Sequence, residues 1–184
     1  MRTELFWIPT AFPGRLAVAP RPRGGDWLGD EMAAWRAAGI ETVVSLLTSG
    51  EVGEFGLEDE ANAGAAHGVR FLSLPIPDRE TPASRSAFEG LVSEIAGELT
   101  DGRGVAVHCR QGIGRAGLTA AAVLIAAGLD PAAAVERVST ARGRPVPETP
   151  AQSRWLDEFA RDRPTATSTT ALRAGRASDR SVPA

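Results

Sequence analysis

The chain has 184 residues, 43% of them hydrophobic, and a formal net charge of −3, a composition typical of one soluble globular domain. The mildly acidic balance gives no reason to expect nucleic acid as a partner. All twenty basic residues are arginine and tyrosine is absent, which excludes a Schiff-base lysine, a P-loop lysine and a tyrosine nucleophile. One cysteine cannot form an internal disulfide, and with two histidines it is too little for a dedicated zinc site.

Residues 1–27 are interrupted by prolines and glycines and lack the continuous apolar core of a signal peptide. No later stretch approaches the roughly 20 apolar residues that a membrane span needs. We therefore expect a cytoplasmic monomer that does not associate with a membrane.

Short apolar segments alternate along the chain with alanine-rich segments of helical length. Strands are predicted at 5–8, 15–19, 41–47, 69–77 and 104–109, and helices at 25–39, in the second half of 51–68, at 84–99, at 115–128 and after residues 130 and 149. This alternation predicts an α/β domain with a central, mostly parallel sheet and helices on both faces. The domain is expected to cover 1–163, and the Ser/Thr/Ala/Arg-rich residues 164–184 are predicted to form a disordered tail.

Four helix starts carry a residue that can accept hydrogen bonds from the first backbone N–H groups. Asp26 and Ser84 are the first two candidates. Asp130 and Thr149 each precede a proline, a residue favoured at the first helical position.

The stretch VAVHCRQGIGRAG, residues 105–117, holds the single cysteine, Cys109, between a buried strand and a helix. A glycine-rich turn that opens a helix gathers backbone N–H groups and the positive end of the helix dipole at one point, so it binds anions. Arg115 adds a planar fork of donors that suits two oxygens of one phosphate. The same positive field favours the thiolate form of Cys109, so the loop combines an oxyanion site with an activated nucleophile.

The run HCRQGIGR resembles the signature of the protein tyrosine phosphatase superfamily, in which His-Cys, five residues and Arg follow one another, and is most similar to the compact dual-specificity branch. The segment LPIPD resembles the one that carries the general acid of this family, which indicates Asp78. The late segment ETPAQSRWLDEF resembles the helix that supplies a glutamine, here Gln152. The resemblance covers roughly residues 5–161.

This resemblance implies the phosphatase fold and a role for each matched residue. Cys109 would attack phosphorus, and Asp78 would protonate the leaving oxygen and then activate water. Arg115 and the backbone amides of Arg110 to Arg115 would hold the phosphoryl oxygens. His108 would orient the loop through its ring hydrogen bonds, Gln152 would help place the water, and no metal or cofactor is required. The implied substrate is a phosphorylated protein that carries phosphotyrosine, with or without phosphoserine and phosphothreonine. The substrate-binding residues are Arg110, Gln111, Gly112, Ile113 and Gly114.

Ala116 departs from the family pattern, which has Ser or Thr directly after the arginine. That hydroxyl helps the cysteine sulfur leave when the intermediate is hydrolysed, so its absence bears on turnover more than on phosphate binding. A phosphate- or phosphoprotein-binding module with weak turnover is therefore the alternative. A rhodanese-type sulfurtransferase would also use a cysteine in an anion-binding loop, but it would need neither Asp78 nor Gln152. Glu80 is the rival carboxylate for the role of Asp78.

Overall fold

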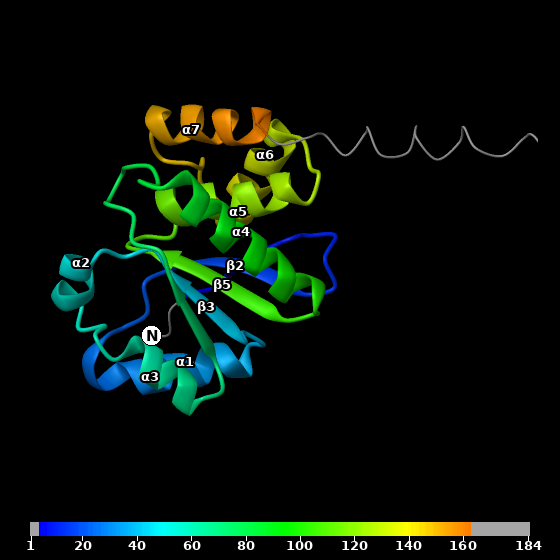
Figure 1. Ribbon diagram of the computed structural model, residues 1–184. Helices are drawn as coiled ribbons and strands as arrows, with labels where there is room; N and C mark the ends of the chain where they lie inside the picture. The colour runs from blue at the N-terminus through cyan, green and yellow to red at the C-terminus, as the bar shows by residue number, and fades with distance from the viewer. Residues whose placement is uncertain (1–3, 163–184) are drawn as a thin grey trace, which may run out of the picture.

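A five-stranded sheet lies at the centre of the computed structural model, which describes residues 4–162 (Figure 1). The strands are β1 (Phe6–Ile8), β2 (Arg15–Pro20), β3 (Thr42–Ser45), β4 (Arg70–Ser73) and β5 (Gly104–Cys109). They lie in the order β1-β2-β5-β3-β4. β1 is antiparallel to β2, and the other three pairings are parallel. The predicted α/β fold with a mostly parallel sheet is confirmed.

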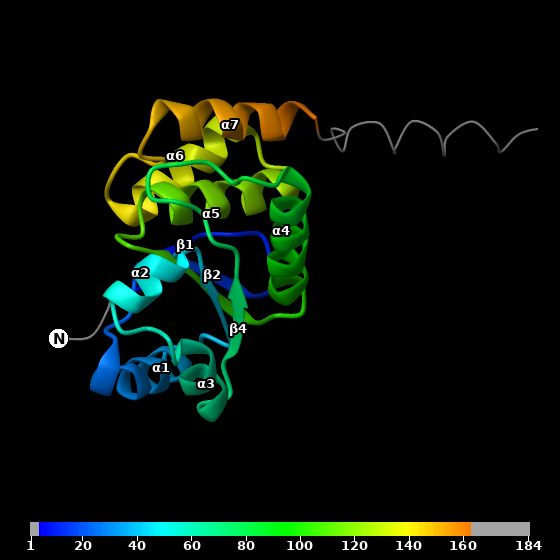
Figure 2. The ribbon, with the colours of Figure 1, turned by 60° about the vertical axis from the view of Figure 1, so that its left-hand side comes forward.

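Helices cover both faces of this sheet, as Figures 1 and 2 show from two directions. One face carries α4 (Arg85–Thr100), α5 (Gly114–Ala126), α6 (Pro131–Arg142) and α7 (Pro150–Arg161). The opposite face carries α1 (Leu28–Ala37), which follows the 3₁₀ turn η1 (Gly25–Trp27), and α3 (Glu60–Ala66). The short helix α2 (Ser49–Glu54) follows β3 and lies beyond the sheet, beside neither layer (Figure 1).

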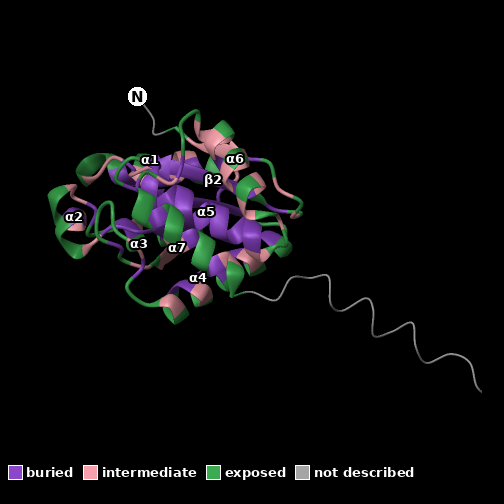
Figure 3. Cartoon of the chain, turned by 90° about the horizontal axis from the view of Figure 1, so that it is seen from above, coloured by how far each residue is buried: buried purple, intermediate pink, exposed green. Residues whose placement is uncertain are grey.

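The central strand β5 contributes to two apolar cores because its side chains alternate between the faces. Val105 and Val107 pack into the larger core, beneath α4 to α7. Ala106 packs into the smaller core, beneath α1 and α3. Helix α5 is buried from Gly114 to Ile125 and lies in the middle of the larger layer (Figure 3). Every residue of β5 is buried, and α5 is buried over nearly its whole length; the segment between them is the cysteine loop.

The predicted helix starts are confirmed at three places and wrong at one. Ser84, Asp130 and Thr149 each accept a hydrogen bond from a backbone N–H of the first turn of α4, α6 and α7. Asp26 does not cap α1, because it lies inside the 3₁₀ turn η1 and α1 begins at Leu28 with no side-chain cap.

The sequence predicted helix only in the second half of residues 51–68, where α3 lies. Helix α2 was not predicted: it begins at Ser49 and covers the start of that segment. It begins with a capping box: Thr48 Oγ1 accepts from the Glu51 N–H (3.3 Å), and Glu51 Oε2 accepts from the Thr48 N–H (3.0 Å). This reciprocal pair stabilises the start of a helix of only six residues. So short a helix shows no apolar periodicity by which the sequence could have predicted it. Strand β4 ends at Ser73, before the predicted end of 77, because Pro75 and Pro77 cannot donate to a neighbouring strand.

The boundary predicted between a domain (1–163) and a disordered tail (164–184) lies outside the described residues and stays a prediction. Within residues 4–162, no helix has the length and apolar character needed to cross a membrane.

Candidate active site

The cysteine loop forms the floor of a pocket at the carboxyl end of the central strand. This is the edge where ligands bind in open α/β sheets. Cys109 is the last residue of β5 and has 3% of its surface exposed. The pocket has a volume of about 290 Å³ and is lined by Asp78, Arg79, Cys109, Arg110, Gln111, Gly114, Arg115 and Glu148. A phosphoryl group fits a space of this size, with the thiol at its base.

Gly112 gives the loop its tight path across the end of β2. Its φ of +67° lies in the left-handed region. A Cβ atom at this position would lie 2.4 Å from the carbonyl carbon and 2.5 Å from the oxygen of Ala19. Both the conformation and the close approach require glycine here.

Arg142, the last residue of α6, holds the loop from outside the pocket. Its Nε donates to the Gly112 carbonyl (2.9 Å) and its Nη2 to the Gln111 carbonyl (3.0 Å). The guanidinium lies 4.0 Å from the centre of the Phe6 ring. Burial and the charge of Arg144 lower the pKa of Arg142. Both loop carbonyls accept hydrogen bonds from Arg142, which does not line the pocket, and this fixes the path of the loop. The sequence carries no local signal for this contact.

Arg115 lies at the start of α5 with 1% of its surface exposed. Nη1 donates to Glu51 Oε2 (2.7 Å) and to the carbonyl of Ile76 (2.8 Å), and Nη2 donates to Glu51 Oε1 (2.8 Å). Its Nε has no hydrogen-bond partner among residues 4–162. Burial alone would lower the pKa of Arg115, but the hydrogen bond to Glu51 and the nearby charges of Cys109, Glu51 and Asp78 raise it. The guanidinium is therefore fixed in orientation and keeps one donor free.

Glu51 is the bidentate partner of Arg115, and sequence reasoning missed it as a site residue. Burial would raise its pKa, but the hydrogen bonds from Arg115 and from the Thr48 backbone, with the charge of Arg115, lower it from 4.5 to about 2. The carboxylate is therefore charged near neutral pH. The signal that could have found it is the Thr-x-x-Glu spacing of a capping box, just after a buried strand.

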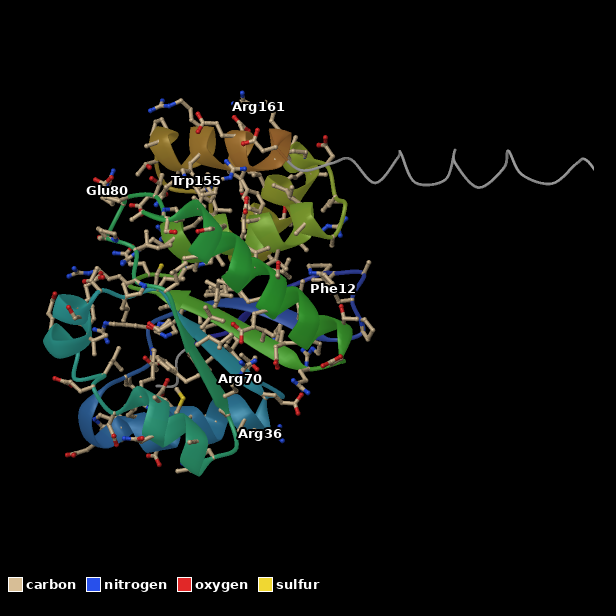
Figure 4. All side chains as sticks on the ribbon, in the orientation of Figure 1. Phe12, Arg36, Arg70, Glu80, Trp155 and Arg161 are labelled. Atoms are coloured by element: carbon tan, nitrogen blue, oxygen red, sulfur yellow. The ribbon has the colours of Figure 1, made fainter. Side chains whose placement is uncertain are left out.

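Asp78 reaches the same guanidinium from the segment between β4 and α4. Its Oδ1 accepts from Arg115 Nη2 at 2.8 Å, and its side chain is 45% exposed. Glu80, the rival carboxylate, is exposed and lies at the outer edge of this segment (Figure 4). Of the two carboxylates, the structure brings Asp78 to Arg115 and to the pocket.

The N-terminus of α7 holds the segment that carries Asp78. Thr149 Oγ1 donates to the Arg79 carbonyl (3.3 Å), and Gln152 Nε2 donates to the Glu80 carbonyl (2.9 Å). The other end of the Gln152 amide, Oε1, accepts from the N–H groups of Glu148 and Thr149 (3.1 and 3.3 Å). Gln152 is fully buried and next to Gly114. These contacts give Gln152 a structural task, and its role in placing water stays a prediction.

Three further residues named from the sequence lie around the loop. Ile113 was expected to bind substrate, but its side chain packs in the larger core and does not line the pocket. Only its backbone N–H could therefore bind an anion. Ala116 is fully buried, and Thr119, the one hydroxyl-bearing residue of α5, donates instead to the Arg115 carbonyl (2.9 Å). His108 is fully buried beneath α1, where its ring packs edge-on against Trp35.

Within the described residues, no three His, Cys, Asp or Glu side chains are grouped so that they could hold a metal ion. The positive groups of the pocket are the guanidiniums of Arg79, Arg110 and Arg115. What the pocket offers is a thiol, a fixed guanidinium and a carboxylic acid on three separate elements.

Residues 6–178 match the family described as PTP-SAK: Swiss Army Knife protein, DSP-PTPase phosphatase domain. The chain belongs to this family. The resemblance to the dual-specificity branch of the protein tyrosine phosphatases, drawn from the cysteine loop, is confirmed, and a dual-specificity-type phosphatase domain is established. The sulfurtransferase hypothesis fails, and the relatives do not favour a module that only binds phosphate.

Among curated proteins, the chain is 30% identical over 126 residues to cyclin-dependent kinase inhibitor 3 of Rattus norvegicus. The match takes in 67% of this chain and 59% of that protein, so the chain spans less than two thirds of the relative's length.

Two solved structures share the fold. Kinase associated phosphatase superposes with a TM-score of 0.77 at 18% identity, over 89% of this chain and 99% of that one. Tk-PTP in its active form superposes with a TM-score of 0.69 at 28% identity, over 82% of this chain and 94% of that one.

Proposed function

We propose that this chain is a cysteine-dependent phosphatase that hydrolyses phosphomonoesters of phosphoproteins through a phosphocysteine intermediate. The observation that carries the proposal is the meeting of Cys109, Arg115 and Asp78 in one pocket of about 290 Å³. The free Nε–H of Arg115 gives a phosphoryl oxygen a donor that no protein group occupies. The fixed guanidinium then stabilises charge that shifts onto the phosphoryl oxygens in the transition state.

In the first step, the Cys109 thiolate forms a bond to phosphorus while the bond from phosphorus to the ester oxygen breaks. Asp78 gives its proton to that oxygen, so a neutral alcohol leaves. Its half-exposed position beside the pocket lets the carboxyl group exchange Arg115 for the substrate oxygen.

In the second step, a water molecule attacks phosphorus and gives a proton to the Asp78 carboxylate. The sulfur–phosphorus bond breaks, and inorganic phosphate and the thiolate are released. The same carboxyl group therefore acts as acid and then as base.

A phosphoprotein substrate is supported by the charges at the mouth of the pocket and by the relatives. Arg79 lines the pocket from the segment after β4 and Arg110 from the cysteine loop, and each is paired with an exposed carboxylate, Glu148 and Glu54 respectively. A cation that is already paired can exchange its partner for an acidic side chain of a peptide. The cytoplasmic location and monomeric state expected from the sequence remain predictions.

The test is hydrolysis of p-nitrophenyl phosphate and of phosphotyrosine, phosphoserine and phosphothreonine peptides. Cys109→Ser should abolish turnover without loss of folding, because the hydroxyl is not an effective nucleophile here. Arg115→Lys should lose most activity although the charge is kept, because lysine cannot present two parallel donors. Full activity in Cys109→Ser would overturn the mechanism, and a wild type that binds phosphate without turnover would restore the binding-module alternative.

The role of Asp78 is tested by the leaving group. Asp78→Asn should lower kcat by a factor of about 10² to 10⁴ for an alkyl phosphate. The loss should be smaller for p-nitrophenyl phosphate, whose phenolate leaves without a proton. Glu80→Gln is the matched control and should leave both rates unchanged; the reverse pattern would transfer the role to Glu80.

A further inference from the structure

A cluster of unpartnered polar atoms lies behind the cysteine loop. Among the described residues, seven buried side-chain nitrogen and oxygen atoms have no hydrogen-bond partner, one of them Nε of Arg115. The other six belong to Trp35, Ser45, Glu60 and His108. Buried polar groups are costly unless they are satisfied, so four such residues in one place call for an explanation.

Two of these side chains come from α1 and α3, and the other two from the strands beneath: Trp35 and Glu60, and Ser45 and His108. Figures 1 and 2 show α1 and α3 on one face of the sheet. Ser45 of β3 is paired with His108 of β5 in parallel register, so the two side chains point to the same side. The Trp35 ring from α1 lies 6.1 Å from the His108 ring, edge-on. Glu60, the first residue of α3, brings its Oε1 to 2.9 Å from His108 Nε2, although the ring N–H is not aligned with the oxygen.

Glu60 is unusual among the buried carboxylates. Glu31, Glu51 and Glu98 each contact an arginine, at 2.6 to 2.8 Å. Glu60 has 1% of its surface exposed and meets an imidazole instead. A buried carboxylate costs several kcal/mol unless its partner compensates, and an apolar side chain would fill this position beside the smaller core without that cost. The position of Glu60 is therefore explained by what it does to His108.

His108 is the residue directly before the nucleophile. Its backbone is held on both sides in the sheet, paired with Ala19 of β2 and Ser45 of β3, and its carbonyl accepts from the Leu46 N–H (3.1 Å). Its ring Nε2 lies 2.9 Å from Glu60 Oε1, and the ring packs edge-on against Trp35. Consecutive Cα atoms are about 3.8 Å apart, so the position of His108 largely determines where Cys109 lies. The anion-binding loop begins from the same point.

We propose that Glu60 is a positioning residue: its carboxylate holds the buried His108 ring and thereby sets the geometry of Cys109 at the end of β5. The inference rests on the proposed function of Cys109 as a nucleophile. Loss of the carboxylate lets the ring move, so the Cys109 sulfur occupies a wider range of positions. The rate of its attack on phosphorus then falls. It leaves the Arg115 site, and so the affinity for phosphate, nearly unchanged.

The experiment compares Glu60→Leu, which removes the polar contact with the ring, with Glu60→Gln, which keeps a side-chain oxygen of the same reach. We expect Glu60→Leu to lower kcat for p-nitrophenyl phosphate about tenfold or more, because small displacements of a reacting atom are costly, with KM within about twofold. Glu60→Gln should retain most of the rate. The exposed neighbour Glu58 supplies the control, and Glu58→Gln should change nothing.

A double-mutant cycle tests the route through His108. If Glu60 acts through the ring, Glu60→Leu should have little further effect in a His108→Asn background, since contacting residues are not additive. Fully additive losses would overturn the proposal. So would a lowered melting temperature with kcat per folded molecule unchanged, which is the result of a merely structural role. If the leucine variant does not fold, Glu60→Met removes the same polar contact with a good helix-forming residue.

Alkylation of Cys109 by iodoacetamide gives a readout that needs no phosphatase activity. Cys109 is the single cysteine, so the rate refers to one site. Glu60→Leu should slow alkylation in parallel with kcat. Suppose that the wild type shows no turnover, but Glu60→Leu is alkylated more slowly than the wild type. This result would refute the proposed function and leave this inference standing. An alkylation rate that does not respond to Glu60 would overturn the inference alone.

Discussion

At the scale of single residues, the pocket depends on an ion pair whose partners are 64 positions apart, Glu51 and Arg115. The pKa of Glu51 is lowered to about 2 in the folded chain. Since a lowered carboxyl pKa means that folding favours the charged form, this stabilisation is complete above about pH 4.5 and is lost as the pH falls towards 2.

We therefore expect Glu51→Gln to lower the free energy of unfolding by about 2–3 kcal/mol near pH 7. The difference between wild type and variant should shrink as the pH falls below 4.5. Urea unfolding at several pH values measures it, with the exposed Glu58→Gln as control. A difference that is independent of pH would show that the charge of Glu51 is not what stabilises the fold. The variant should also lose kcat/KM, because Arg115 is no longer held from behind.

Ala116 bears on the second chemical step. No hydroxyl stands at this buried position, and Thr119 is committed to the Arg115 carbonyl. Phosphocysteine should form normally and break down slowly, so the wild type should show a pre-steady-state burst of released alcohol. Ala116→Ser should raise kcat and shrink the burst; a hydrogen bond to a charged sulfur contributes about 1.5–3 kcal/mol at most, or roughly tenfold or more in rate. Absence of a burst, with no gain in the variant, would mean that another group performs this task.

At the scale of elements, the loop is shaped by α6 as well as by its own glycines. Arg142→Met keeps packing against Phe6 but removes the donors to the Gln111 and Gly112 carbonyls. We expect kcat/KM to fall about tenfold or more, since two hydrogen bonds that orient the anion site are lost. Arg137→Met on the same helix is the control, because Arg137 donates to the Pro9 carbonyl (3.4 Å) and not to the two loop carbonyls that accept from Arg142. Equal losses in the two variants would point to a general effect of α6.

At the scale of the whole molecule, distant parts of the chain build the anion site: the β5–α5 loop and the segment after β4 line the pocket, and α2 holds Arg115 through Glu51. An anion that binds this site stabilises the folded state, by about 2.7 kcal/mol when its concentration is 100 times its dissociation constant. We expect inorganic phosphate to raise the melting temperature of the wild type and of Cys109→Ser alike. Arg115→Lys should lose most of this rise. A rise that persists in the lysine variant would place phosphate elsewhere.

The sequence by itself determined the α/β alternation, three of the helix caps, the cysteine loop and, through the loop, the family. These features are local: a cap depends on neighbours three residues apart, and the loop depends on glycines and an arginine within one turn. The sequence also indicated Asp78, although only the fold separates it from Glu80.

The tertiary structure alone decided the residues that hold the proposed catalytic groups in place. Glu51 holds Arg115 across 64 residues, Arg142 holds the Gly112 carbonyl across 30, and Glu60 meets His108 from another helix. The capping-box spacing marks Glu51 as a residue of a helix start, but no pattern in the chain pairs it with Arg115. The other two contacts leave no such pattern either, because each partner is brought in by the fold and not by its neighbours in sequence. Side chains that react can be read from a motif, whereas side chains that orient them become visible only when distant segments are brought together.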